Sequence, residues 1–141
     1  MAVTSEATTL WTGDLESGKG HTTLDSSKAA ELPMSWAARS QGAAGKSNPE
    51  ELLGAAHSAC FSMQFASLLT KNGTTAESIQ VTAAVTFAPG EGITGSHLLV
   101  SAKVPEISEE DFERIAEEAK ATCPVSLALA GTSITLEASL A

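Results

Sequence analysis

The sequence predicts an α+β fold, because segments with the alternating pattern of strands stand on both sides of a long helical segment. Two turn signals, at residues 17–20 and 89–92, each separate two polar or β-branched segments and indicate two β-hairpins. Between the hairpins, residues 49–71 are rich in helix-forming apolar residues. A length of 141 residues suits one domain, so we expect a single domain over residues 1–141.

The first elements are expected to be strands. The first hairpin should lie between Thr8 and Asp25, with its turn at Ser17–Gly20. A third short strand is expected around Met34 to Ala37. The small and glycine-rich segment from Ser40 to Ser47 then predicts a loop.

The central helix has clear start and stop signals. Asn48 can cap it, Pro49 fits its first position, and Glu51 stands three residues after the cap. The helix should end near Lys71, before Gly73. Its apolar residues leave little polar face, so we expect burial between a sheet and a second subunit, with a two-layer monomer as the alternative.

The second half of the chain is also expected to contain both strands and helices. Residues 77–87 and 95–104 predict the second hairpin, and Ser108 should cap a second, amphipathic helix. A short helix is expected after Cys123, and Ser133–Ser139 should form the final strand. The predicted order is hairpin, strand, long central helix, hairpin, second helix, short helix, strand.

Charge and composition exclude several classes of partner. A net charge of −9 with eight Lys and Arg argues against binding to nucleic acid or to an anionic membrane. The N-terminus lacks the pattern of a secretory signal, and we expect no apolar run near the ~18 residues of a membrane span. A cytoplasmic location is therefore expected, where a transient catalytic disulfide is commoner than a structural one.

Two cysteines, Cys60 and Cys123, are the main candidates for chemistry. A thiolate that is oxidised to a sulfenic acid gains from a second thiol that resolves it as a disulfide. The alternative is that both are buried structural cysteines in a non-enzymatic stress or small-molecule binding module.

A reactive Cys60 would need a nearby cation. It lies about 16 Å along the helix from Pro49, too far for the helix dipole to lower its pKa. The chain has two arginines, and Arg114 stands among acidic residues. Arg39 has no acidic sequence neighbour and precedes the central helix, so Arg39 is the candidate.

His57 shares a helix face with Cys60 because it stands three residues before it. This spacing permits a Cys-His pair, as in a cysteine hydrolase, although a packed or interface histidine is the commoner case. The spacing of His57, Cys60 and Cys123 is unlike that of a zinc site, so no metal is expected.

Two motifs carry a resemblance to a known family. The stretch NPEELLGAAHSACFSM over residues 48–63 and the sequence CPVS over residues 123–126 resemble the OsmC/Ohr thiol peroxidases, and the chain is more similar to the OsmC branch. Where OsmC-type sequences often carry a lysine in the second motif, this chain has Leu127.

The resemblance implies an intertwined α+β homodimer with active sites at the subunit interface. It implies that Cys60 is the peroxidatic cysteine, that Cys123 resolves it, and that Arg39 and Glu50 serve as the activating arginine and the glutamate that positions it. The expected activity is thiol-dependent reduction of organic hydroperoxides, and of hydrogen peroxide, with an external thiol or dithiol as reductant and no cofactor.

One geometric question accompanies this assignment. On one straight helix, Glu50 and Cys60 are about 15 Å apart. A joint site therefore needs a break near Gly54, a long reach by Arg39, or the partner subunit.

Overall fold

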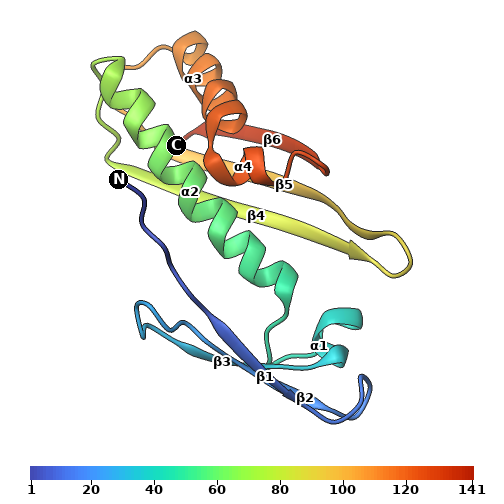
Figure 1. The fold of residues 1–141 in the computed structure, drawn as a ribbon. Coiled ribbons are helices and arrows are strands. Elements are labelled where there is room, and N and C mark those ends of the chain that lie inside the picture. The colour runs from blue at the N-terminus through green and yellow to red at the C-terminus, as the bar shows by residue number, and fades with distance from the viewer. The chain divides into compact units, whose positions relative to one another are not determined.

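The computed structural model describes residues 1–141, which divide into two compact units, Met1–Leu52 and Leu53–Ala141. The chain contains both helices and small sheets, so the predicted α+β class is confirmed (Figure 1). The expectation of one domain over the whole chain stays a prediction.

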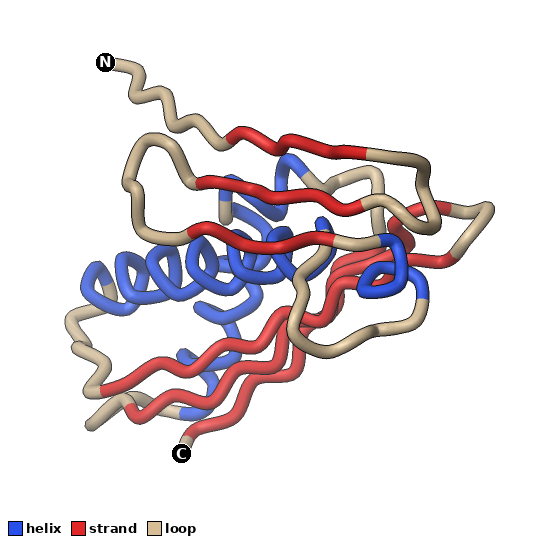
Figure 2. The backbone as a smooth tube through the Cα atoms, turned by 90° about the horizontal axis from the view of Figure 1, so that it is seen from below, coloured by secondary structure: helices blue, strands red, loops and turns tan.

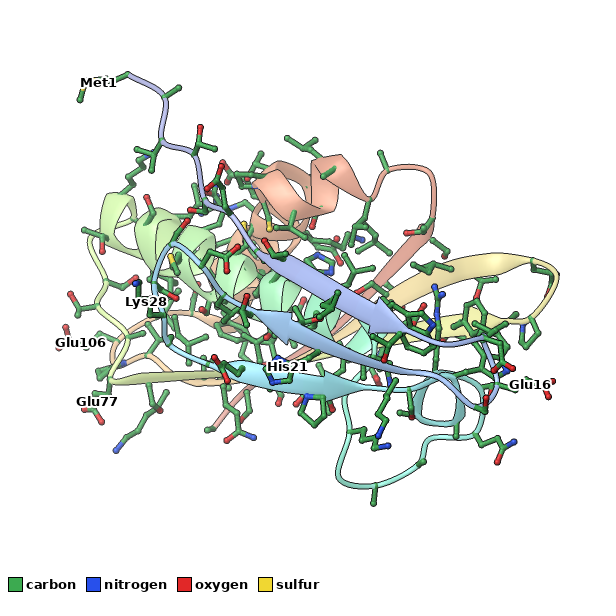
Figure 3. All side chains as sticks on the ribbon, turned by 60° about the horizontal axis from the view of Figure 1, so that its bottom comes forward. Met1, Glu16, His21, Lys28, Glu77 and Glu106 are labelled. Atoms are coloured by element: carbon green, nitrogen blue, oxygen red, sulfur yellow. The ribbon has the colours of Figure 1, made fainter.

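The first unit is built on a three-stranded antiparallel sheet in the order β1-β2-β3 (Figure 2). Its strands are β1 (Thr8–Thr12), β2 (Lys19–Thr23) and β3 (Glu31–Met34). The first hairpin is therefore confirmed, with Glu16 in the loop at its tip (Figure 3).

The expected third strand is present, but it spans Glu31–Met34, so its expected position around Met34 to Ala37 is wrong after Met34. The chain turns there into a short helix, α1 (Trp36–Ser40). Ser35 caps this helix, because its hydroxyl accepts a hydrogen bond of 3.0 Å from the Ala38 N–H.

The long helix α2 (Pro49–Lys71) agrees with the prediction at both ends. The Asn48 side-chain oxygen accepts the Glu51 N–H at 2.8 Å, and Gly73 follows the helix with φ of +83°. The helix runs without interruption through Gly54, so a break at that residue is not present. A Cβ at Gly54 would stand 2.8 Å from the Ala83 carbonyl oxygen, so this glycine lets α2 lie close against the sheet.

By length and composition, α2 is apolar enough to cross a membrane, so the expectation that no segment approaches this limit is wrong. Core helices of globular proteins pass the same test. Three of its large side chains, Phe61, Phe65 and Leu69, are fully buried in the core of the second unit.

The second unit contains a sheet in the order β4-β5-β6. The strands are β4 (Ser78–Ala88), β5 (Gly92–Lys103) and β6 (Ser133–Leu140). The predicted second hairpin is confirmed, although β5 starts earlier than expected because pairing with β4 continues past a bulge at Thr86/Phe87. Strand β6 pairs parallel to β5, so a crossover connection must separate them.

That crossover contains α3 (Glu109–Thr122) and α4 (Pro124–Ala128), as predicted. Ser108 caps α3 by accepting the Asp111 N–H at 3.1 Å. Helices α2 and α3 lie on the same face of the sheet (Figure 1). Between them, Phe65 and Phe112 meet edge to face with ring centroids 5.5 Å apart. This core also encloses Cys123.

The opposite side of α2 is not covered by the other elements of the second unit. It presents a row of exposed apolar residues at helical spacing, and Met63 is 70 % exposed. The row, called here the α2 outer face, consists of Ala55, Ala56, Ala59, Met63 and Ala66.

Candidate active site

The two thiols meet in the second unit. The Sγ atoms of Cys60 and Cys123 lie 3.0 Å apart, although 63 residues separate them along the chain. Both cysteines are free; Cys60 is half-buried and Cys123 is buried. A disulfide S–S bond is about 2.05 Å long, so the two sulfurs need to approach by only about 1 Å to form one.

Cys123 is held at the junction of two helices. It ends α3, where its N–H donates to the Ala119 carbonyl at 2.9 Å, and it caps the start of α4, where its carbonyl accepts the Leu127 N–H at 3.0 Å. Pro124 takes the first position of α4, which has no need of an N–H. The backbone of Cys123 is thus fixed on both sides.

The surroundings of Cys60 favour the protonated thiol. Burial raises the pKa of Cys60, and the hydrogen bond with Cys123 raises it further, whereas the backbone N–H of Val125 acts in the opposite direction. The thiolate is the nucleophile, so a reactive Cys60 requires a positive charge from elsewhere.

The arginine and the glutamate meet in the first unit. The Arg39 guanidinium donates to Glu50 through Nη2 at 2.8 Å and through Nε at 3.0 Å, both to Oε1. The Glu50 side chain is only 6 % exposed, whereas that of Arg39 is 32 % exposed. A buried carboxylate that holds two guanidinium nitrogens fixes the orientation of the planar group while part of it remains accessible.

Arg39 also lines a cavity in the first unit. The cavity has a volume of about 490 Å³ and its wall is mostly apolar. Besides Arg39, the larger side chains that line it are Trp11, Leu15, Met34, Trp36 and Leu52. Such a space suits an apolar group beside a positive charge.

The structure therefore brings the four residues predicted from sequence together in two pairs. Arg39 is paired with Glu50 in the first unit, and Cys60 is paired with Cys123 in the second. The spacing of these residues along the sequence does not indicate that the two members of either pair are in contact.

His57 is not paired with Cys60. It is completely buried, and its ring nitrogens are hydrogen-bonded to two serines, Nδ1 to Ser96 Oγ at 2.7 Å and Nε2 to Ser126 Oγ at 2.8 Å. Burial lowers its pKa, which favours the neutral ring. Both ring nitrogens bind serine hydroxyls, so the geometry does not support His57 and Cys60 as a catalytic pair.

The two serines were not identified from the sequence. Ser96 lies on β5 and Ser126 on α4, at 39 and 69 residues from His57. Ser126 belongs to the CPVS motif, which was the one available signal.

Comparison with known proteins gives one consistent family. A family model described as OsmC-like protein matches residues 42–139. The peroxiredoxin OsmC of Escherichia coli strain K12 is 39 % identical over 132 residues, which is 92 % of both chains.

Solved structures share the fold. An OsmC-like protein of unknown function from Vibrio cholerae has a TM-score of 0.77 at 17 % identity, covering 98 % of this chain and 100 % of the other. An organic hydroperoxide resistance protein OsmC from Legionella pneumophila has a TM-score of 0.72 at 21 % identity, covering 99 % and 98 %.

Proposed function

The chain belongs to the OsmC-like protein family, and we propose that it is a cysteine-based peroxidase that reduces organic hydroperoxides with electrons from an external thiol or dithiol. The observation that carries the proposal is the 3.0 Å contact between the Cys60 and Cys123 sulfurs. A half-buried thiol beside a buried second thiol is the arrangement that two-step thiol oxidation requires.

The proposed first step is attack of the Cys60 thiolate on the distal oxygen of the hydroperoxide. The S–O bond forms, the O–O bond breaks, and the alkoxide leaves as the alcohol after it takes a proton. Cys60 is then a sulfenic acid, oxidised by two electrons.

In the second step, the Cys123 sulfur attacks the Cys60 sulfur. The S–S bond forms, and the oxygen leaves as water with the proton of Cys123. An external thiol or dithiol, as a reducing cytoplasm would supply, reopens the disulfide by exchange. These reaction steps need no metal, flavin or haem.

Arg39 is proposed to supply the positive charge that Cys60 needs. A guanidinium stays charged at every relevant pH, and Glu50 holds it in one orientation. The Arg39 side chain is 32 % exposed, and this accessible part is proposed to face a thiolate and a peroxide oxygen. The same charge would stabilise the alkoxide that develops as the O–O bond breaks.

We propose that the active unit is a homodimer. The α2 outer face is apolar and is not covered within the second unit, and α2 continues unbroken past Gly54, so no bend at that residue joins Glu50 to Cys60. A second copy that covers this face would exclude water from it and could bring Arg39 to Cys60 of the partner subunit.

The cavity beside Arg39 supports an organic hydroperoxide as substrate. Its wall of tryptophan, leucine and methionine side chains can take the alkyl or aryl group, while Arg39 takes the peroxide oxygens. Hydrogen peroxide fits the same chemistry but would leave the apolar wall unused.

Counting thiols tests the proposal directly. The reduced protein is titrated with a chromogenic thiol reagent before and after one equivalent of cumene hydroperoxide. The proposal expects the loss of two thiols per chain in the wild type and no rapid loss in Cys60→Ser.

Other outcomes identify other functions. No loss of thiols would overturn the peroxidase and support a binding module with structural cysteines. Trapping of Cys60 by an acylating reagent without peroxide would support a cysteine hydrolase.

A further inference from the structure

Helix α2 contacts the α3–α4 junction at three points along one side. The contacts are His57 Nε2 to Ser126 Oγ at 2.8 Å, Cys60 Sγ to Cys123 Sγ at 3.0 Å, and Gln64 Nε2 to Thr122 Oγ1 at 2.8 Å. The α2 residues stand at i−3, i and i+4 relative to Cys60, the spacing that puts side chains on one helix face. The thiol pair is therefore flanked by one hydrogen bond on each side.

The two flanking bonds differ in their surroundings. The bond from Gln64 to Thr122 is exposed, whereas His57, Ser96 and Ser126 are all buried. At an exposed site, water can replace either partner, so breaking the bond has a small effect. A buried bond has no such replacement, and its loss leaves polar atoms without a partner.

The imidazole of His57 joins three elements. From α2 it reaches Ser96 on β5 with one nitrogen and Ser126 on α4 with the other. A neutral ring has one donor and one acceptor nitrogen, and each hydroxyl can play the complementary part. The ring therefore ties α4 to the sheet and to the helix that carries Cys60.

Ser126 is close to the chemistry along the chain. It stands three residues after Cys123 and directly after Val125, whose backbone N–H is directed to the Cys60 sulfur. A shift of α4 would move the Cys123 sulfur and this N–H together.

We propose that His57 is a positioning residue for disulfide formation, which holds the Cys123 sulfur against Cys60 through its buried hydrogen bond to Ser126. The inference rests on the proposed function, because it concerns the step in which Cys123 attacks the Cys60 sulfenic acid and water leaves. His57 takes no proton in this step. Its effect is on the distance and direction of attack, to which reaction rates are sensitive.

The test uses two serine variants that remove one partner each from the same imidazole. Ser126→Ala releases α4, and Ser96→Ala leaves α4 tied, while both leave one ring nitrogen without its hydroxyl. Any general loss of stability caused by the unpaired nitrogen is therefore matched between the two alanine variants. Ser126→Thr is a further control, because it keeps the hydroxyl.

The readout is the fate of the Cys60 sulfenic acid. Disulfide formation by Cys123 competes with oxidation by a second hydroperoxide, which gives a sulfinic acid with two added oxygens. Each protein receives a series of cumene hydroperoxide concentrations, and intact mass gives the ratio of disulfide to sulfinic acid. We compare the hydroperoxide concentration at which disulfide and sulfinic acid form in equal amounts. We expect this concentration to be about 10-fold lower in Ser126→Ala than in the wild type. In Ser96→Ala it should stay within about 2-fold of the wild type, and Ser126→Thr should restore the wild-type value.

Equal shifts in Ser126→Ala and Ser96→Ala, or no shift in Ser126→Ala, would overturn the inference. If the wild type formed no disulfide with hydroperoxide, the proposed function would fail. The positioning role of His57 would then be tested in a glutathione redox buffer. In that buffer the ratio of disulfide to dithiol reports the proximity of the two sulfurs. We expect about 10-fold less disulfide in Ser126→Ala than in Ser96→Ala, and equal ratios would overturn the inference.

Discussion

Arg39 holds Glu50 through two guanidinium nitrogens, at 2.8 and 3.0 Å from the same carboxylate oxygen. The carboxylate is buried, so this arginine is both the proposed source of charge for Cys60 and the cation that neutralises Glu50. Removal of the arginine alone would leave a buried charge unpaired, which typically costs about 3 kcal/mol or more. A test of catalysis must separate these two effects.

Arg39→Ala combined with Glu50→Gln removes the guanidinium without leaving a buried carboxylate. We expect this double variant to remain folded and to react with cumene hydroperoxide at least ~10²-fold more slowly, because the thiolate and the transition state lose their cation. Stopped-flow measurement of Cys60 oxidation gives the rate, and Glu50→Gln alone is the matched control. A double variant within a few-fold of the wild type would remove Arg39 from the site.

Cys123→Ser should separate the two steps of the cycle. We expect one reaction with hydroperoxide at nearly the wild-type rate, because Cys60 alone performs the attack, and no turnover with a dithiol. Intact mass should show passage of Cys60 to the sulfinic acid in excess peroxide. Normal cycling of Cys123→Ser with a dithiol, or a first step still present in Cys60→Ser, would show that the roles are assigned wrongly.

Met63→Glu should disrupt the homodimer, because it places a charge in the middle of the α2 outer face. Light scattering at micromolar concentration should give a dimer for the wild type and a monomer for the variant. Glu113→Lys, an equally drastic change at an exposed position of α3, should leave the dimer intact. A stable wild-type monomer would contradict the dimer and, with it, a site shared between subunits.

The stability of the protein should fall in mild acid because of His57. Its pKa is lowered by burial in the folded state, so the unfolded chain, with a pKa near 6.5, binds more protons below about pH 7. The free energy of unfolding then decreases as the pH falls through this range, by up to about 1.4 kcal/mol per pH unit for one group.

His57→Gln removes this titration. Urea unfolding at pH 7.5, 6.5 and 5.5 should show a shallower loss of stability in the variant, whatever its stability at pH 7.5. Parallel curves for the two proteins would show that His57 titrates equally in the folded and unfolded states.

Gly54→Ala should destabilise the protein although alanine favours helices. The new Cβ would stand 2.8 Å from the Ala83 carbonyl oxygen, so α2 or β4 must shift. We expect a loss of about 1–3 kcal/mol in urea unfolding, as is usual for overpacking. Gly131→Ala is the control, because a Cβ there meets open space; an equally stable Gly54→Ala would show that the close approach is dispensable.

Local signals in the sequence were sufficient for most elements. Asn48, Pro49 and Gly73 mark the ends of α2, and Ser108 marks the start of α3, because caps depend on atoms a few residues apart. The expected strand after Met34 is wrong although a local signal for a helix is present there. Ser35 acts as a helix cap there, a local signal that the expectation of a strand ignored.

The sequence by itself determined the α+β class, the family, and the identity of the two thiols. The tertiary structure decided the distances: the contact of Cys60 with Cys123, the pairing of Arg39 with Glu50, and the parallel position of β6. It also decided that His57 binds two serines rather than Cys60. These contacts join residues 11 to 69 positions apart, and only the packing of helices against the sheet, or of one sheet segment beside another, fixes which side chains meet.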